Sequence, residues 1–290
     1  MRVMLLLMGE QPAANLLPVR RDRPECVVIL HTTRTVKQAH RLAKLLDVQV
    51  VMLPVDPYQI TSIVESIHSC IRDHHWENES IVFNLTGGTK PMSFAAYEVA
   101  RSLAAPAIYF QTEGGQSHIY RYAFDADSNF RSVGEDDVVE SITLADYMGL
   151  YLDNVFVGEP REPLEAAVAD ALRRAGLEVM SSVYPQGLGG VEIDLVIRDG
   201  NQIGVMEIKS KGAKAGIDQV VAVAGQRHIG TYVSRFLVSI TELDKNNQKI
   251  ADAHNVAVIL LPGYSVKSSA LSQQDGERLA TAVLQKMRRT

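Results

Sequence analysis

The chain has 290 residues, which is enough for one or two domains that each bury a hydrophobic core. Its composition, 46% hydrophobic and 22% charged, is typical of a soluble globular protein, and no run of eighteen apolar residues predicts a membrane span. The net charge of −5 is unusual for a protein that binds nucleic acid without sequence preference. Any nucleic-acid site must therefore be a local basic patch or must use metal ions.

The two cysteines, Cys26 and Cys70, lie far apart and form no Cys-x-x-Cys pair. We therefore expect neither a zinc site nor a disulfide framework, and a reducing, cytoplasmic environment fits. The apolar stretch Met1–Met8 is too short for the apolar part of a signal peptide and predicts a first buried strand.

The first half of the chain alternates short apolar runs with amphipathic stretches. This alternation predicts an α/β fold with a Rossmann-like, doubly wound parallel sheet. The expected strands are Val3–Met8, Cys26–Leu30, Gln49–Leu53, Ile81–Asn84 and Ala107–Phe110, and the expected helices lie near Thr35–Leu46, Tyr58–His75 and Pro91–Leu103.

A glycine-rich loop follows the fourth expected strand, at the edge where such sheets bind ligands. Gly87 and Gly88 allow the backbone to approach a ligand closely. Thr89 can cap the next helix, whose first-turn amides would attract an anion, and Lys90 adds a cation. The spacing fits neither a Walker A loop nor the dinucleotide fingerprint, so a tight turn without a ligand remains the alternative.

We expect the chain to divide into a first domain of residues 1–140, a linker of residues 141–162 and a second domain of residues 163–290. The acidic stretch Gly134–Asp137 predicts a break between elements. Thr143–Asn154 predicts a connecting helix, and Glu159–Pro163 predicts a short, stiff linker.

The second half predicts a mixed α/β domain. An amphipathic helix begins at Pro163, and Gly176 ends it as a glycine after a helix C-terminus commonly does. A β-hairpin comes next. We then expect a helix near Gly216–Gly230, a strand at Val233–Ile240, a helix, a strand at Val256–Leu261 and a final helix.

The hairpin carries the residues that predict chemistry. Its strands, Val191–Ile197 and Val205–Lys209, would turn near Gly200 and bring Asp194 beside Glu207. Glu207 and Lys209 share one strand face, because side chains alternate across a strand. Two carboxylates that hold a divalent metal, with Lys209 near the attacking water, would hydrolyse a phosphodiester.

The alternative for this hairpin is a set of solvated cross-strand ion pairs. Gln219 and Gln226 on the following helix favour the nuclease interpretation. Lys211 and Lys214 add positive charge where a phosphate backbone would approach, although a solvated loop explains them equally well.

Asp194, Glu207 and Lys209 resemble the three motif positions of the PD-(D/E)xK nuclease superfamily, a restriction-endonuclease-like fold. Ile193 stands where the motif's proline would be. The resemblance implies that Glu165, on the helix that begins at Pro163, joins Asp194 and Glu207 in the metal shell. It also makes Glu192, on the same strand face as Asp194, a possible supporting acid.

The loop Asn84–Met92, and Gly9–Pro12 with Asn15, resemble the CRISPR-associated Rossmann fold, or CARF, sensor domain. Joined to the nuclease motifs, they make nearly the whole chain similar to the CRISPR ancillary nucleases of type III systems that cyclic tetra-adenylate activates. The resemblance implies a homodimer that binds the activator across its dyad and then cuts DNA, RNA or both with Mn²⁺ or Mg²⁺. The residues implied to line the activator pocket are Gly87, Gly88, Thr89 and Lys90, with Gln11, Thr32 and Thr33 as further candidates.

Three alternatives remain open from the residues alone. The protein would be a non-enzymatic cyclic-oligoadenylate sensor that recruits a partner, a ring nuclease that degrades the activator, or a resolvase-like DNA enzyme that needs no activator. The residues do not distinguish single-stranded DNA, duplex DNA and RNA as substrates. They do not distinguish Mn²⁺ from Mg²⁺, and they do not count the adenylates in the ring.

Overall fold

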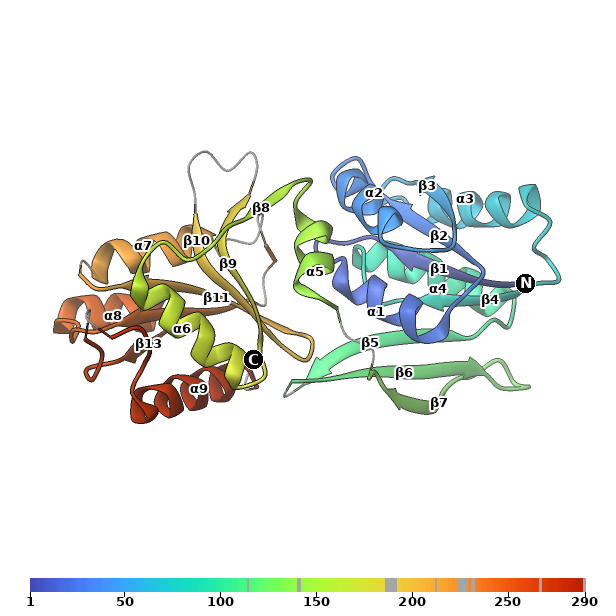
Figure 1. Ribbon diagram of the computed structural model, residues 1–290. Coiled ribbons are helices and arrows are strands. Elements are labelled where there is room, and N and C mark those ends of the chain that lie inside the picture. Colours follow the sequence, from blue (N-terminus) through green and yellow to red (C-terminus); the bar gives the residue numbers. More distant parts are fainter. Residues whose placement is uncertain are drawn as a thin grey trace. The chain divides into compact units, whose positions relative to one another are not determined.

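The computed structural model describes residues 1–113, 115–139, 142–185, 192–211, 213–223, 229–230, 233–265 and 268–288 (Figure 1). Contacts within the chain divide it into two compact units, Met1–Ile142 and Thr143–Thr290. Each unit has its own sheet and its own hydrophobic core.

The described residues of the first unit form a seven-stranded sheet in the order β3-β2-β1-β4-β5-β6-β7. Strands β1 to β5 are parallel to one another, and β6 and β7 add an antiparallel ribbon. The strands are β1 (Arg2–Leu7), β2 (Cys26–His31), β3 (Gln49–Pro54), β4 (Ser80–Asn84), β5 (Ala107–Glu113), β6 (Gln116–Phe124) and β7 (Phe130–Asp137). The helices are α1 (Ala13–Asp22), α2 (Val36–Lys44), α3 (Ile60–Asp73) and α4 (Lys90–Ser102).

The predicted doubly wound parallel sheet is confirmed. Strand β2 is buried along its whole length because helices cover both faces of the parallel part, which is why it reads as a continuous apolar run. One face of β1, with Val3, Leu5 and Leu7, packs in the cluster that α3 and α4 supply. Both cysteines are free and buried.

The acidic break expected at Gly134–Asp137 is wrong, because this stretch lies in β7. Basic side chains on the neighbouring strand β6 explain how the strand tolerates its acids. Arg121 forms an ion pair with Asp136, and His118 lies 3.1 Å from Glu135. Helix α1 was not predicted, since Pro18 in its interior normally argues against a helix.

The described residues of the second unit form a six-stranded sheet in the order β13-β12-β11-β10-β9-β8. The strands from β8 to β11 are antiparallel, and those from β11 to β13 are parallel. The strands are β8 (Val155–Val157), β9 (Glu178–Pro185), β10 (Ile193–Asp199), β11 (Gln202–Lys209), β12 (Ser234–Ser239) and β13 (Val256–Leu260). The helices are α5 (Leu144–Tyr151), α6 (Pro163–Arg174), α7 (Ala213–Val223), α8 (Lys245–Ala253) and α9 (Gln273–Met287).

This mixed α/β arrangement confirms the fold predicted for the second half. Helix α6 begins at Pro163, and Gly176 follows it with a φ of +90°, so the helix ends where glycine is favoured. Strands β8 and β9 were not predicted, because β8 is only three residues long and Ser181 and Ser182 interrupt the apolar pattern of β9. In the part of the chain that the structure describes, no helix combines the length and apolarity needed to cross a membrane.

Candidate active site and candidate nucleotide site

The hairpin of β10 and β11 brings the two predicted carboxylates together. Leu195 pairs with Met206 in the antiparallel register, so the next residues along, Asp194 and Glu207, lie opposite one another. The backbone N–H of Ile208 donates to Asp194 Oδ2 at 2.7 Å. Both acids are almost fully buried, with 6% and 2% of their surfaces exposed.

Burial makes both carboxylates resist ionisation. It raises the pKa of Asp194 to about 6, although the Ile208 hydrogen bond and the Lys209 charge oppose the shift. It raises the pKa of Glu207 to about 8, and the nearby charge of Asp194 adds to the effect. Two adjacent buried acids of this kind are costly unless a cation compensates them.

Lys209 supplies part of that compensation. Its Nζ lies 2.5 Å from Glu207 Oε1, although this oxygen, buried among the described side chains, has no hydrogen bond of ordinary geometry. Burial alone would lower the pKa of Lys209, but the interaction with Glu207 outweighs it and raises the pKa. The ammonium therefore stays protonated at neutral pH and acts as a fixed positive charge.

A divalent cation would compensate the two buried carboxylates where Lys209 alone does not. Asp194 and Glu207 offer hard oxygen ligands, which Mg²⁺ and Mn²⁺ prefer, and Lys209 is the basic side chain that meets Glu207 Oε1. Helix α7 approaches this spot closely at Gly216, where a Cβ would lie 3.0 Å from the Lys209 side chain. The cluster therefore has a tightly packed wall on that side.

Glu165 adjoins the cluster without closing it. It is buried in the first turn of α6, and the backbone N–H of Arg161 donates to its Oε2 at 2.8 Å. No combination of oxygens from Glu165, Asp194 and Glu207 lies mutually within 4.8 Å, so these three described acids do not form a ready three-carboxylate cage. The charge of Glu165 nevertheless contributes, after burial, to the raised pKa values of the other two acids.

The structure adds Arg161, which sequence reasoning missed. Its Nη1 lies 2.8 Å from Glu192 Oε2, and Glu192 shares a strand face with Asp194. Gln219 of α7 donates to the Glu192 carbonyl at 3.1 Å, while Gln226 lies outside the described residues. Lys211 and Lys214 are exposed.

The candidate nucleotide site lies where the strand order of the first sheet reverses, between β1 and β4. The loops after these strands touch, since a Cβ on Gly9 would lie 3.0 Å from the Gly88 nitrogen. A Cβ on Gly87 would lie 2.0 Å from the Leu7 carbonyl oxygen, and Gly88 has a φ of +73°. Glycine is therefore required at both positions of the predicted loop.

Thr89 and Lys90 begin α4 at this loop. The Thr89 hydroxyl accepts from the Met92 N–H at 3.4 Å and donates to the Pro57 carbonyl at 2.6 Å, so it caps α4 and also holds the loop between β3 and α3. Lys90 is exposed. In the first turn of α4, Pro91 has no N–H and the Met92 and Ser93 N–H groups already bond Thr89, so the Lys90 N–H and the Lys90 ammonium are the anion-binding groups at this end of the helix.

The other candidate residues have unequal surroundings. Thr33 is exposed and Gln11 is half-buried, whereas Thr32 is buried, accepts from the Arg34 N–H at 3.2 Å and donates its own N–H to Thr35 Oγ1 at 3.0 Å. Thr32 therefore stabilises its own turn.

Two buried amides brace the loops after β1 and β4. Asn15 donates to the Leu7 carbonyl at 3.0 Å, and Asn84 donates to Asn15 Oδ1 at 3.0 Å. The Thr86 hydroxyl donates to Asn84 Oδ1 at 2.6 Å. Asn15, part of the CARF-like motif, thus links the ends of β1 and β4 and so holds the two glycine loops in place.

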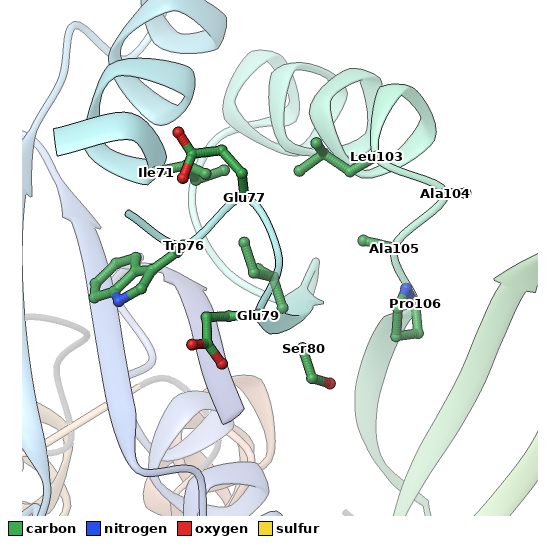
Figure 2. Close-up of a pocket in the computed structure, with 10 residues that line it drawn as sticks. Ile71, Trp76, Glu77, Glu79, Ser80, Leu103, Ala104, Ala105 and Pro106 are labelled. Carbon is green, nitrogen blue, oxygen red and sulfur yellow. The ribbon is translucent and has the colours of Figure 1, made fainter. Parts of the chain in front are cut away.

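A separate pocket of about 210 Å³ lies at the amino ends of β4 and β5 (Figure 2). Trp76 and Glu79 line one side of it, and Leu103 and Pro106 line the other. It is at the edge of the sheet opposite the glycine loops, and parallel sheets bind their ligands at the carboxyl edge. We therefore do not assign this pocket to the nucleotide.

A second group with metal-ligand spacing occurs on β6 and β7. His118 Nδ1 lies 3.1 Å from one oxygen each of Glu135 and Asp137. Both acids are exposed, and exposed acidic groups are common without a bound ion, so we assign no metal to this group.

The fold and the two sites define a class: a nucleotide-binding type of Rossmann-like sheet joined to a restriction-endonuclease-like domain. Family models agree with this division. Residues 3–147 match the Card1 CARF domain, and residues 160–269 match a restriction endonuclease domain. The chain belongs to the family of proteins that carry a Card1-type CARF domain, and its resemblance to the CARF-containing CRISPR nucleases is confirmed.

Solved structures show the same two-part fold. Can2 from Sulfobacillus thermosulfidooxidans in complex with cyclic tetra-adenylate has a TM-score of 0.71 and 14% identity, with 99% of each chain covered. Protein VC1899 from Vibrio cholerae has the same score and identity, with 99% of this chain and 98% of that one covered.

A type III CRISPR defence DNA nuclease activated by cyclic oligoadenylate has a TM-score of 0.58 and 16% identity, over 97% of this chain and 44% of its own. At such identities these likenesses establish the fold alone. No curated protein sequence matches the chain.

Proposed function

We propose that this protein is a divalent-metal-dependent endonuclease of type III CRISPR defence, active in the cytoplasm as a homodimer and switched on by cyclic tetra-adenylate. One observation carries the proposal: Asp194 and Glu207 are buried side by side against Lys209 in a restriction-endonuclease-like domain. A CARF domain precedes them in the same chain.

Asp194 and Glu207 would hold Mn²⁺ or Mg²⁺. When bound, the ion polarises the phosphate and makes water a stronger nucleophile at neutral pH. Lys209, kept protonated by Glu207, orients the attacking water and stabilises negative charge that develops on the phosphate. Glu165, whose Oε2 accepts a hydrogen bond from the Arg161 N–H, would add a negative charge that helps to hold the metal ion from the α6 side.

The activator would bind at the glycine loops of the first unit. Gly87, Gly88, Thr89 and Lys90 offer a closely approachable backbone and a cation, and Gln11, Thr32 and Thr33 lie on the neighbouring loops. The Can2 complex with cyclic tetra-adenylate, which has the same fold, supports this choice of ligand and its ring size.

Activation requires the ligand to prefer the cleaving arrangement of the dimer, because a ligand that binds two states equally shifts nothing. A hundredfold activation corresponds to about 3 kcal/mol of such preference. The domains would then be residues 1–140 for sensing, 141–162 for connection and 163–290 for cleavage. In the structure, the connecting stretch carries α5 and β8.

The test is cleavage of supercoiled plasmid and labelled single-stranded RNA with Mn²⁺ and cyclic tetra-adenylate. We expect the wild-type protein to cut at least one substrate, and both EDTA and Glu207→Ala to abolish cutting. Activator binding without cleavage of either substrate would instead indicate a sensor that recruits a partner.

A further inference from the structure

The candidate active site gathers more acidic side chains than basic ones. Glu165, Glu192, Asp194 and Glu207 are all buried or half-buried there. Lys209 is already paired with Glu207. A nucleic-acid backbone that approaches these acids is repelled unless another cation meets it.

Arg161 is in the right place to be that cation. Its backbone N–H bonds Glu165 and its guanidinium bonds Glu192, so the residue spans two acids beside Asp194. Its side chain is 64% exposed, and the guanidinium lies 5.3 Å from the centre of the Tyr184 ring, which limits its orientation.

Aromatic side chains continue from Arg161 toward the edge of the sheet. Val183 pairs with Ile193, so the next pair along is Tyr184 with Glu192, and the two side chains interact. Phe156 of the edge strand β8 pairs with Tyr184, which places both rings on one face of the sheet. Phe156 is 64% exposed, which is unusual for an aromatic ring and suits stacking on a nucleotide base.

We propose that Arg161 binds the phosphate backbone of the nucleic-acid substrate beside the scissile bond, and that Tyr184 and Phe156 contact the adjoining nucleotides. This inference rests on the nuclease function proposed above and assigns its substrate-binding residues. In the free protein, Glu192 holds the Arg161 guanidinium in position. On binding, phosphate oxygens replace that carboxylate.

The exchange is energetically reasonable. The Arg161 side chain is largely exposed, and Glu192 keeps its hydrogen bond with Tyr184 when Arg161 leaves, so releasing Glu192 costs little. A guanidinium binds two phosphate oxygens at once, and such charge-assisted pairs are stronger than neutral hydrogen bonds. Side-chain substitutions at Arg161 also leave its backbone N–H bond to Glu165 intact, so the role of the guanidinium can be tested separately.

The experiment measures binding without cleavage. Full-length protein carrying Glu207→Gln is titrated into fluorescein-labelled DNA or RNA oligonucleotides, with and without cyclic tetra-adenylate, at several salt concentrations. We expect Arg161→Ala to weaken binding about tenfold and to reduce the slope of log affinity against log salt by about 0.7 to 1. Arg161→Lys should restore part of that slope.

Two matched controls sharpen the result. Arg174→Ala removes the same charge at the far end of α6, about 17 Å along the helix axis from Pro163, and should leave affinity unchanged. Phe156→Ala should weaken binding about tenfold, whereas Val157→Ala, on the opposite strand face, should not.

Glu192→Gln tests whether Glu192 competes with phosphate for Arg161 or instead helps Arg161 to bind it. If Glu192 competes with phosphate for Arg161, the substitution should tighten binding by about threefold to tenfold. Weaker binding with Glu192→Gln, or an unchanged salt slope with Arg161→Ala, would overturn the inference. Because cleavage is not measured, these outcomes are independent of whether the protein is shown to be a nuclease.

Discussion

The two candidate sites of this protein are built in opposite ways. In the first unit the site depends on the absence of side chains, because Gly87 lies so close to the Leu7 carbonyl that no Cβ fits. In the second unit it depends on side chains that are costly to bury, the carboxylates of Asp194 and Glu207. The first site should therefore lose ligand binding when a side chain is added at a glycine. The second should lose activity when a carboxylate is removed.

The largest effect is expected on cleavage, from a change in the buried pair Asp194 and Glu207. Glu207→Gln should reduce cleavage about a thousandfold or more, equivalent to about 4 kcal/mol of transition-state stabilisation. The same change should raise the melting temperature of the metal-free protein at pH 8, because it removes a charge from a buried position. Cleavage rates and calorimetry on one preparation check both effects, and a variant with normal cleavage would refute the assigned role.

The next effect is expected at the glycine loop. Gly87→Ala should lower the free energy of unfolding by roughly 3 kcal/mol and weaken cyclic tetra-adenylate binding, because the added methyl meets a backbone oxygen. Gly134→Ala is the control in the same unit, since a Cβ there meets nothing within 4 Å. Denaturant unfolding and ligand titration should separate the two variants clearly, and equal stability of both would contradict the close approach.

The buried acids should also make stability depend on pH. The pKa of Glu207 rises from 4.5 to about 8 on folding, so between these values the folded state binds more protons than the unfolded state. The free energy of unfolding of the metal-free protein should therefore fall as pH rises from about 5 to 8. Calorimetry in EDTA should show this fall, Glu207→Gln should flatten it, and Mn²⁺ should stabilise the protein most at the upper end.

The smallest effect compares two helix caps of the same chemistry. Thr89 caps α4 at the nucleotide site, and Thr143 caps α5 in the second unit. Each Thr→Ala change should cost about 1 kcal/mol of stability. Only Thr89→Ala should also weaken activator binding, and if Thr143→Ala weakened it equally, the effect would be one of general stability.

The sequence predicted the arrangement of residues at both candidate sites because the signals for it are local. A turn at Gly200 and strand alternation are enough to place Asp194 beside Glu207, and paired glycines after a strand indicate a close backbone approach. Arg161 was missed because its partner Glu192 is 31 positions away and comes near only once the sheet and α6 have packed. Strand β7 was missed because its acids look like a loop until Arg121 and His118 on the neighbouring strand are known.

The most direct test of the account measures activator binding and cleavage in two variants side by side. We predict that Glu207→Ala binds cyclic tetra-adenylate as the wild-type protein does but cuts nothing. We predict that Lys90→Ala binds the activator weakly and cuts only at high activator concentration. Cleavage by the wild-type protein that is indifferent to cyclic tetra-adenylate, or cleavage that survives in Glu207→Ala, would contradict the division of roles between the two sites.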